Sequence, residues 1–237
     1  MRGPRLMPGF TDSPVELTTA ATDVLLAILA FICIVYLRQY RSLDGWKVGV
    51  WSWTLAAFSA AALLGAVVHG LELSDATKTL LWRPLYLLLA LVVALFVVAA
   101  SYDWLGKRSA WRVLAAMMPV ALGFFVFTQI WSDSFRVFVV YETASMLVAL
   151  AIYVYLAAGK RLTGAGLMAS AILLNVLAAG IQADGSIRLT VIWPFDHNGV
   201  FHVVQMVAVL VLIAGLRRSL ACFSSPPANA RPVRSPG

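Results

Sequence analysis

The chain has 237 residues, of which 61% are hydrophobic and only 12% are charged, and its formal net charge is +7. Soluble domains carry about 25% charged residues, so this chain lacks the charge to cover a surface that faces water. The composition excludes a soluble globular domain, a disordered chain and a nucleic-acid-binding module, and the positive charge is typical of basic cytoplasmic loops in a membrane protein.

Seven apolar stretches follow one another, and each is long enough for a transmembrane helix of about 20 residues. Their residues are continuously apolar rather than alternating, which argues against a β-barrel. The sequence therefore predicts an all-α fold, a polytopic seven-transmembrane-helix bundle within residues 1–218, followed by a disordered cytoplasmic tail at 219–237 that is rich in Ser, Pro and Arg. The seven predicted spans are 17–37, 48–70, 79–102, 110–131, 136–158, 164–183 and 197–216.

Basic residues alternate between the two ends of these spans. Twelve of the 18 Lys and Arg residues fall in the first, third and fifth loops and in the C-terminal tail. Because cytoplasmic loops carry an excess of Lys and Arg, we expect the N-terminus outside and the C-terminus in the cytoplasm. The high Ala and Leu content and the short loops are typical of a multi-pass protein of a bacterial inner (cell) membrane.

Polar side chains occur at one level of the predicted bundle, toward its outer face. Asp23, Glu142 and His202 lie one to two turns inside the first, fifth and seventh spans, and Gln182 closes the sixth. Polar groups in hydrocarbon are costly and usually face the bundle interior. Two interpretations are open, a functional polar pocket or a set of interhelical hydrogen bonds. We expect Glu142 to face the interior and either to pair with a histidine or to carry a proton.

The three histidines of the chain also fall at the outer end. His69 closes the second span, and His197 and His202 open the seventh. Neutral imidazole is a ligand for zinc and similar metals, and a catalytic zinc takes three protein ligands and leaves a position for water. The sequence predicts that these histidines hold a zinc ion, with Glu142 or Asp196 as the base that takes the proton of the bound water. Asp196 or Asn198 can alternatively cap the last helix.

A seven-span bundle with a histidine late in its second span and a histidine pair opening its seventh resembles the superfamily of alkaline ceramidases and progestin and adiponectin receptors. The resemblance implies a membrane metal hydrolase in which histidines hold zinc and an amide in a lipid is cleaved. His69 matches the ligand in span two, and His197 and His202 match the pair in span seven. The pair is five residues apart here and usually four in the superfamily, and Gly65 stands where the superfamily has a serine.

The leading hypothesis from the sequence is a zinc-dependent membrane hydrolase that acts on a lipid amide or ester at the outer face, with a role in lipid metabolism and membrane lipid as its partner. The alternative is a non-enzymatic seven-helix receptor or sensor that binds a small ligand in the same pocket. A transporter is a weaker third hypothesis, because the spans show no interrupted pair in corresponding halves. The sequence leaves the oligomeric state open, and it predicts no nucleic-acid partner.

Overall fold

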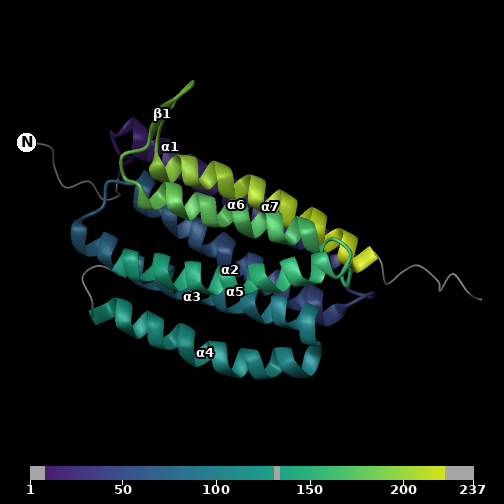
Figure 1. Cartoon of the computed structure of the whole chain (residues 1–237). Coiled ribbons are helices and arrows are strands. Elements are labelled where there is room, and N and C mark those ends of the chain that lie inside the picture. Colours follow the sequence, from purple (N-terminus) through teal and green to yellow (C-terminus); the bar gives the residue numbers. More distant parts are fainter. Residues whose placement is uncertain (1–8, 131–133, 222–237) are drawn as a thin grey trace, which may run out of the picture.

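The structure is a bundle of seven helices with one short hairpin, seen in a computed structural model that describes residues 9–130 and 134–221 (Figure 1). All seven helices are long and apolar enough to cross a membrane, which confirms the predicted all-α seven-helix bundle and identifies the chain as a multi-pass integral membrane protein. The helices are α1 (Pro14–Arg38), α2 (Gly45–Gly70), α3 (Asp75–Leu105), α4 (Lys107–Ile130), α5 (Ser134–Ala158), α6 (Ala165–Ala183) and α7 (His197–Ala221).

The helix lengths and outer surfaces fit a bilayer. The shortest helix, α6, has 19 residues, which at 1.5 Å per residue makes about 28 Å, close to the hydrocarbon thickness of about 30 Å. The outward side chains are apolar, as Ile28, Phe31 and Ile32 of α1 illustrate, each at least half exposed. Helix α7 continues to Ala221, past the predicted domain end at 218, and the predicted tail beyond Ala221 lies outside the described residues.

Six helices form a closed ring, and α4 lies outside it. Around the ring, α1 packs on α2, α2 on α3, α3 on α5, α5 on α6, α6 on α7, and α7 again on α1. Helix α4 packs mainly on α3 and lies at the edge of the bundle (Figure 1). The interior of the ring is therefore bounded by α1, α2, α3, α5, α6 and α7.

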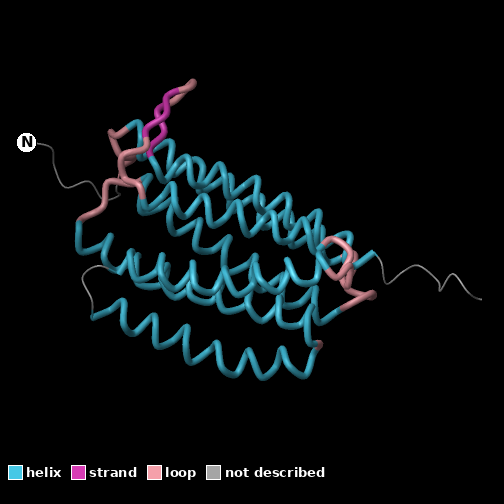
Figure 2. Tube along the Cα trace, viewed as in Figure 1, coloured by secondary structure: helices cyan, strands magenta, loops and turns pink. Residues whose placement is uncertain are grey.

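A two-stranded antiparallel hairpin, absent from the prediction, connects α6 to α7. Strand β1 (Arg188–Thr190) pairs with β2 (Pro194–Asp196), and the hairpin projects beyond one end of the helices (Figure 2). We call this end the histidine end, because α2 finishes there near His69 and α7 begins there at His197. Strand β2 packs against α1, so the hairpin delivers Asp196 to the first turn of α7 and to the side of α1.

A buried ion pair fastens three helices at the opposite end. Lys47 of α2 pairs with Asp103 of α3, and the two side chains are only 2% and 3% exposed. The hydroxyl of Tyr153 on α5 donates to the other oxygen of Asp103 at 2.9 Å. A buried charge is tolerated when it is paired and its remaining acceptors are satisfied, so this cluster ties α2, α3 and α5 together at that end.

Candidate functional site

The ring of six helices encloses a cavity of about 380 Å³. Every ring helix contributes to its lining, whereas no described residue of α4 does. Along α2 the lining residues run from Trp51 to His69, which is about 27 Å of helix. The cavity therefore extends through most of the hydrocarbon thickness of about 30 Å.

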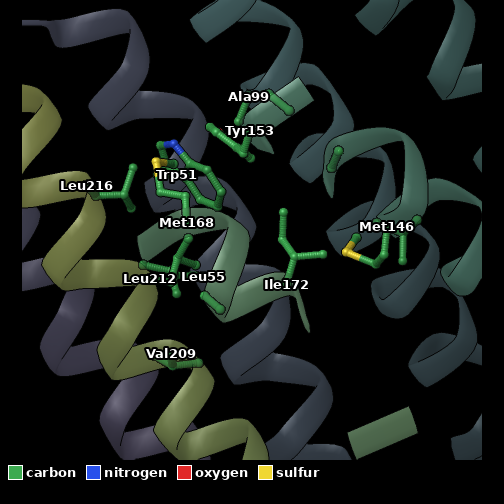
Figure 3. Close-up of a cluster of buried hydrophobic side chains, with 14 of the residues drawn as sticks. Trp51, Leu55, Ala99, Met146, Tyr153, Met168, Ile172, Val209, Leu212 and Leu216 are labelled. Atoms are coloured by element: carbon green, nitrogen blue, oxygen red, sulfur yellow. The ribbon is translucent and has the colours of Figure 1, made fainter. Parts of the chain in front are cut away.

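The lining changes character along this length. From the level of Phe58 to that of Trp51 it is apolar apart from Thr54 and the indole N–H of Trp51, which has no hydrogen-bond partner among the described residues, and we call this part the apolar end. Figure 3 shows Trp51, Leu55 and Leu212 in this region, on α2 and α7. Toward the histidine end lie the polar lining residues, which we call the polar end: Asp23, His69, Glu142, Asn175, Gln182, His197, Asn198, His202 and Gln205.

His202 pairs with Asp23 across the interface of α7 and α1. Its Nε2 lies 3.3 Å from Oδ1 of Asp23, and its Nδ1 lies 3.0 Å from the hydroxyl of Thr22. That hydroxyl donates its proton to the carbonyl of Thr19 at 2.8 Å. A hydroxyl has one proton to donate, so Thr22 accepts from His202 and Nδ1 carries a hydrogen. The Nε2 atom on the other side of the ring then faces Oδ1 of Asp23.

His69 pairs with a different acid. Its Nδ1 lies 2.6 Å from Oε2 of Glu16, in the first turn of α1. The edge of Trp82 on α3 lies against the same imidazole, with ring centroids 6.4 Å apart. His69 thus joins α1, α2 and α3 where the cavity meets the histidine end.

Asp196 serves as the cap of α7, one of the two roles considered from the sequence. Its Oδ1 accepts from the backbone N–H of Gly199 at 2.9 Å and from the hydroxyl of Thr19 at 3.0 Å. Burial works against its charge, but these hydrogen bonds, the neighbouring His197 and an amide bond from Asn198 outweigh burial and hold the pKa of Asp196 below its usual range. A carboxylate that already accepts these bonds is a weak base, which disfavours the predicted catalytic role.

Glu142 faces the interior, as predicted, and is 7% exposed. Its contact is an amide rather than a histidine, because Nδ2 of Asn175 on α6 donates to Oε1 of Glu142 at 2.9 Å. The amide of Gln205 on α7 donates in turn to Oδ1 of Asn175 at 3.2 Å. A chain of three polar side chains therefore crosses α5, α6 and α7 inside the cavity.

The three histidines line one cavity but do not gather around one point. His69 pairs with Glu16, His202 with Asp23, and Nδ1 of His197 lies 4.0 Å from Oδ2 of Asp196. Across residues 9–130 and 134–221, no group of three or more His, Cys, Asp or Glu side chains is placed to hold a metal ion. This arrangement does not fit the predicted zinc site.

Gly65 explains one difference from the resembled superfamily. A Cβ atom at this position would lie 2.7 Å from Oδ2 of Asp23, closer than van der Waals contact allows. Asp23 therefore occupies the space that a serine side chain would need. The pocket has an aspartate from α1 at the place where the resemblance predicts a hydroxyl from α2.

Two atoms at the polar end lack protein partners. Oδ2 of Asp23 and Nδ1 of His197 are buried without a hydrogen-bond partner among the described residues. Buried polar atoms are nearly always hydrogen-bonded, so these two atoms are available to groups that do not belong to the chain. Three further residues complete the site and were not predicted from the sequence: Asn175, Gln205 and Glu16. An amide side chain inside an apolar span is a signal that could have identified Asn175 and Gln205.

One comparison with known proteins gives a match. The model of the family of unknown function DUF6962 matches residues 18–221, a range that includes every lining residue of the cavity. No curated protein and no solved structure matches the chain.

Proposed function

The chain belongs to the DUF6962 family, and we propose that it binds a small amphiphilic molecule within the membrane, in the cavity enclosed by its six-helix ring. The observation that carries this proposal is the cavity itself, about 380 Å³ with a polar end and an apolar end. Ligand pockets commonly measure about 300–1,000 Å³ and combine apolar walls with a few polar groups. A molecule with a polar head and an apolar chain matches both ends of this cavity.

Binding is better supported than zinc-dependent lipid hydrolysis. The predicted hydrolase needs three histidines at one metal and a free base, whereas each histidine here lies beside its own acid and Asp196 is engaged as a helix cap. The alternative considered from the sequence, a receptor or other protein that binds a small ligand, needs only the pocket. The position of the cavity, inside a ring of membrane-spanning helices, supports a ligand drawn from membrane lipid or from molecules dissolved in it.

Tryptophan fluorescence tests this proposal, because Trp51 lines the apolar end and is 1% exposed. The probe is a single-chain alcohol with bromine atoms in its chain, added to protein in nanodiscs of bromine-free phosphatidylcholine. Bromine quenches tryptophan on contact, so occupation of the cavity should give a saturable component of quenching. Trp51→Phe should remove this component and leave the gradual quenching of lipid-facing tryptophans such as Trp53, which is 72% exposed.

A pair of alanine substitutions on α7 supplies the control. Ala208 lines the cavity and Ala214 is exposed. Ala208→Phe should fill the cavity and abolish saturable quenching, whereas Ala214→Phe should leave it unchanged. Quenching that never saturates in the wild-type protein, or that is the same in Ala208→Phe and Trp51→Phe as in the wild type, would refute ligand binding in this cavity.

A further inference from the structure

The acids in and around the cavity differ in whether a basic side chain lies beside them. No Lys or Arg lines the cavity among the described residues. Glu16 and Asp23 lie beside His69 and His202. Asp196 lies 4.0 Å from Nδ1 of His197, which is too far for a hydrogen bond. One acid remains, Glu142, and its hydrogen-bond partner is the neutral amide of Asn175.

The position of Glu142 makes an unpaired charge on it costly. It lies five residues inside the apolar span that begins at Val137, which is about 8 Å along the helix and therefore within the hydrocarbon layer of about 30 Å. A carboxyl group at this depth stays neutral by carrying a proton, or it is stable as a carboxylate when a cation pairs with it. The chain supplies no such cation within the described lining of the cavity, and a ligand can supply it.

We propose that the ligand carries a primary ammonium head group on a single apolar chain, and that Glu142 is the carboxylate that receives the head group. This inference rests on the proposed binding function. An ammonium group has three N–H donors, and Glu142, Asn175 and Gln205 present carboxylate and amide oxygens on one side of the cavity. A metal cation does not suit the site, because the described residues offer no group of three ligating side chains.

The rest of the cavity fits the apolar chain of such a molecule. Between Glu142 and the end of the bundle that carries Lys47, the lining consists mainly of large apolar side chains, including Phe58, Phe96 and Leu212. Lys47, whose ion pair with Asp103 closes that part of the bundle, lies one helical turn beyond Trp51 on α2. The head group is therefore placed at Glu142 and the chain points toward the end that carries Lys47.

Competition against the brominated alcohol tests this assignment. The competitors share one chain length and differ in their head group: a primary amine, an alcohol, a carboxylic acid and a quaternary trimethylammonium. A hydrogen bond to a charged group contributes about 1.5–3 kcal/mol, so the amine should displace the probe at least about 10-fold more effectively than the alcohol at equal membrane content. The quaternary ammonium, which has no N–H donor, should compete less well than the amine.

In Glu142→Gln, the amine and the alcohol, measured side by side in the same variant, should compete with equal potency. Glu72→Gln, a change of an exposed acid between α2 and α3, is the matched control and should preserve the preference for the amine. The inference is overturned if amine and alcohol compete equally, if the quaternary ammonium matches the amine, or if the preference survives in Glu142→Gln. These outcomes would leave the proposed binding function standing. If the alcohol probe itself gave no saturable quenching, both the binding function and the assignment of the head group would be refuted.

Discussion

The carboxylate of Asp23 fills the space beside Gly65, where a Cβ atom would lie 2.7 Å from Oδ2 and 3.0 Å from Cγ of Asp23. The same carboxylate lies 3.3 Å from Nε2 of His202. Close packing of α2 against α1 at Gly65 and the pairing of α1 with α7 are thus two aspects of one contact. A larger side chain at position 65 should therefore displace the Asp23 carboxylate and weaken its pairing with His202.

Gly65→Ala should push the Asp23 carboxylate away from His202. Overpacking a well-packed site costs about 1–3 kcal/mol, and we expect a loss of stability in this range, measured as a lowered midpoint of thermal unfolding in detergent. Gly49→Ala on the same helix is the control, because no atom lies within 4 Å of its added Cβ. Equal midpoints for the two variants would contradict the close contact between Gly65 and Asp23.

The buried ion pair of Lys47 and Asp103, at the end opposite the histidine end, gives a prediction about stability. Lys47→Met removes the cation and leaves Asp103 buried without it, which should cost about 3–5 kcal/mol. In the double variant Lys47→Met with Asp103→Asn, no charge remains and the amide oxygen can still accept from Tyr153, so much of the lost stability should return. Unfolding midpoints of the three proteins check this. A double variant no more stable than Lys47→Met would show that the unpaired charge is not the cause.

The cap of α7 predicts a dependence on pH. The pKa of Asp196 is lower in the folded protein than its usual value, so ionised Asp196 contributes stability above its unfolded pKa of about 3.9. That contribution is lost as pH falls through the folded pKa. Asp196→Asn keeps an acceptor for Gly199 and Thr19 but cannot titrate. The stability difference between wild type and variant should shrink as pH is lowered from 6 toward 3, and a constant difference would contradict the argument.

Membrane orientation remains a prediction from the loop charges. Reporter fusions after Arg108, Arg161 and Arg218 should read as cytoplasmic, and fusions after Asp75 and Arg188 should read as external. The histidine end, which carries the hairpin, would then face outward. A single loop on the wrong side would overturn the predicted placement of the termini.

The number and extent of the helices could be predicted because each span needs about 20 apolar residues, and up-and-down topology alone brings His69 to the level of His197. The side-chain pairings between the helices could not be predicted in this way. The spans are apolar on nearly all sides, so the sequence does not specify how each helix is rotated about its axis. That rotation decides that Glu142 meets Asn175 rather than a histidine, and that Asp23 reaches both His202 and Gly65. The hairpin also escaped prediction, because its strands have only three residues each.

Photo-crosslinking with a single-chain amine that carries a diazirine at the end of its chain tests the central claim, occupation of the cavity, most directly. After irradiation in nanodiscs, mass spectrometry locates the labelled residues, with and without an excess of unlabelled amine. We predict that label at Leu55, Ile172 and Leu212, which line the apolar end, disappears with the competitor. Label at the lipid-facing Ile28 and Phe31 should persist. Label confined to lipid-facing residues, and unaffected by the competitor, would contradict a ligand-binding cavity inside the bundle.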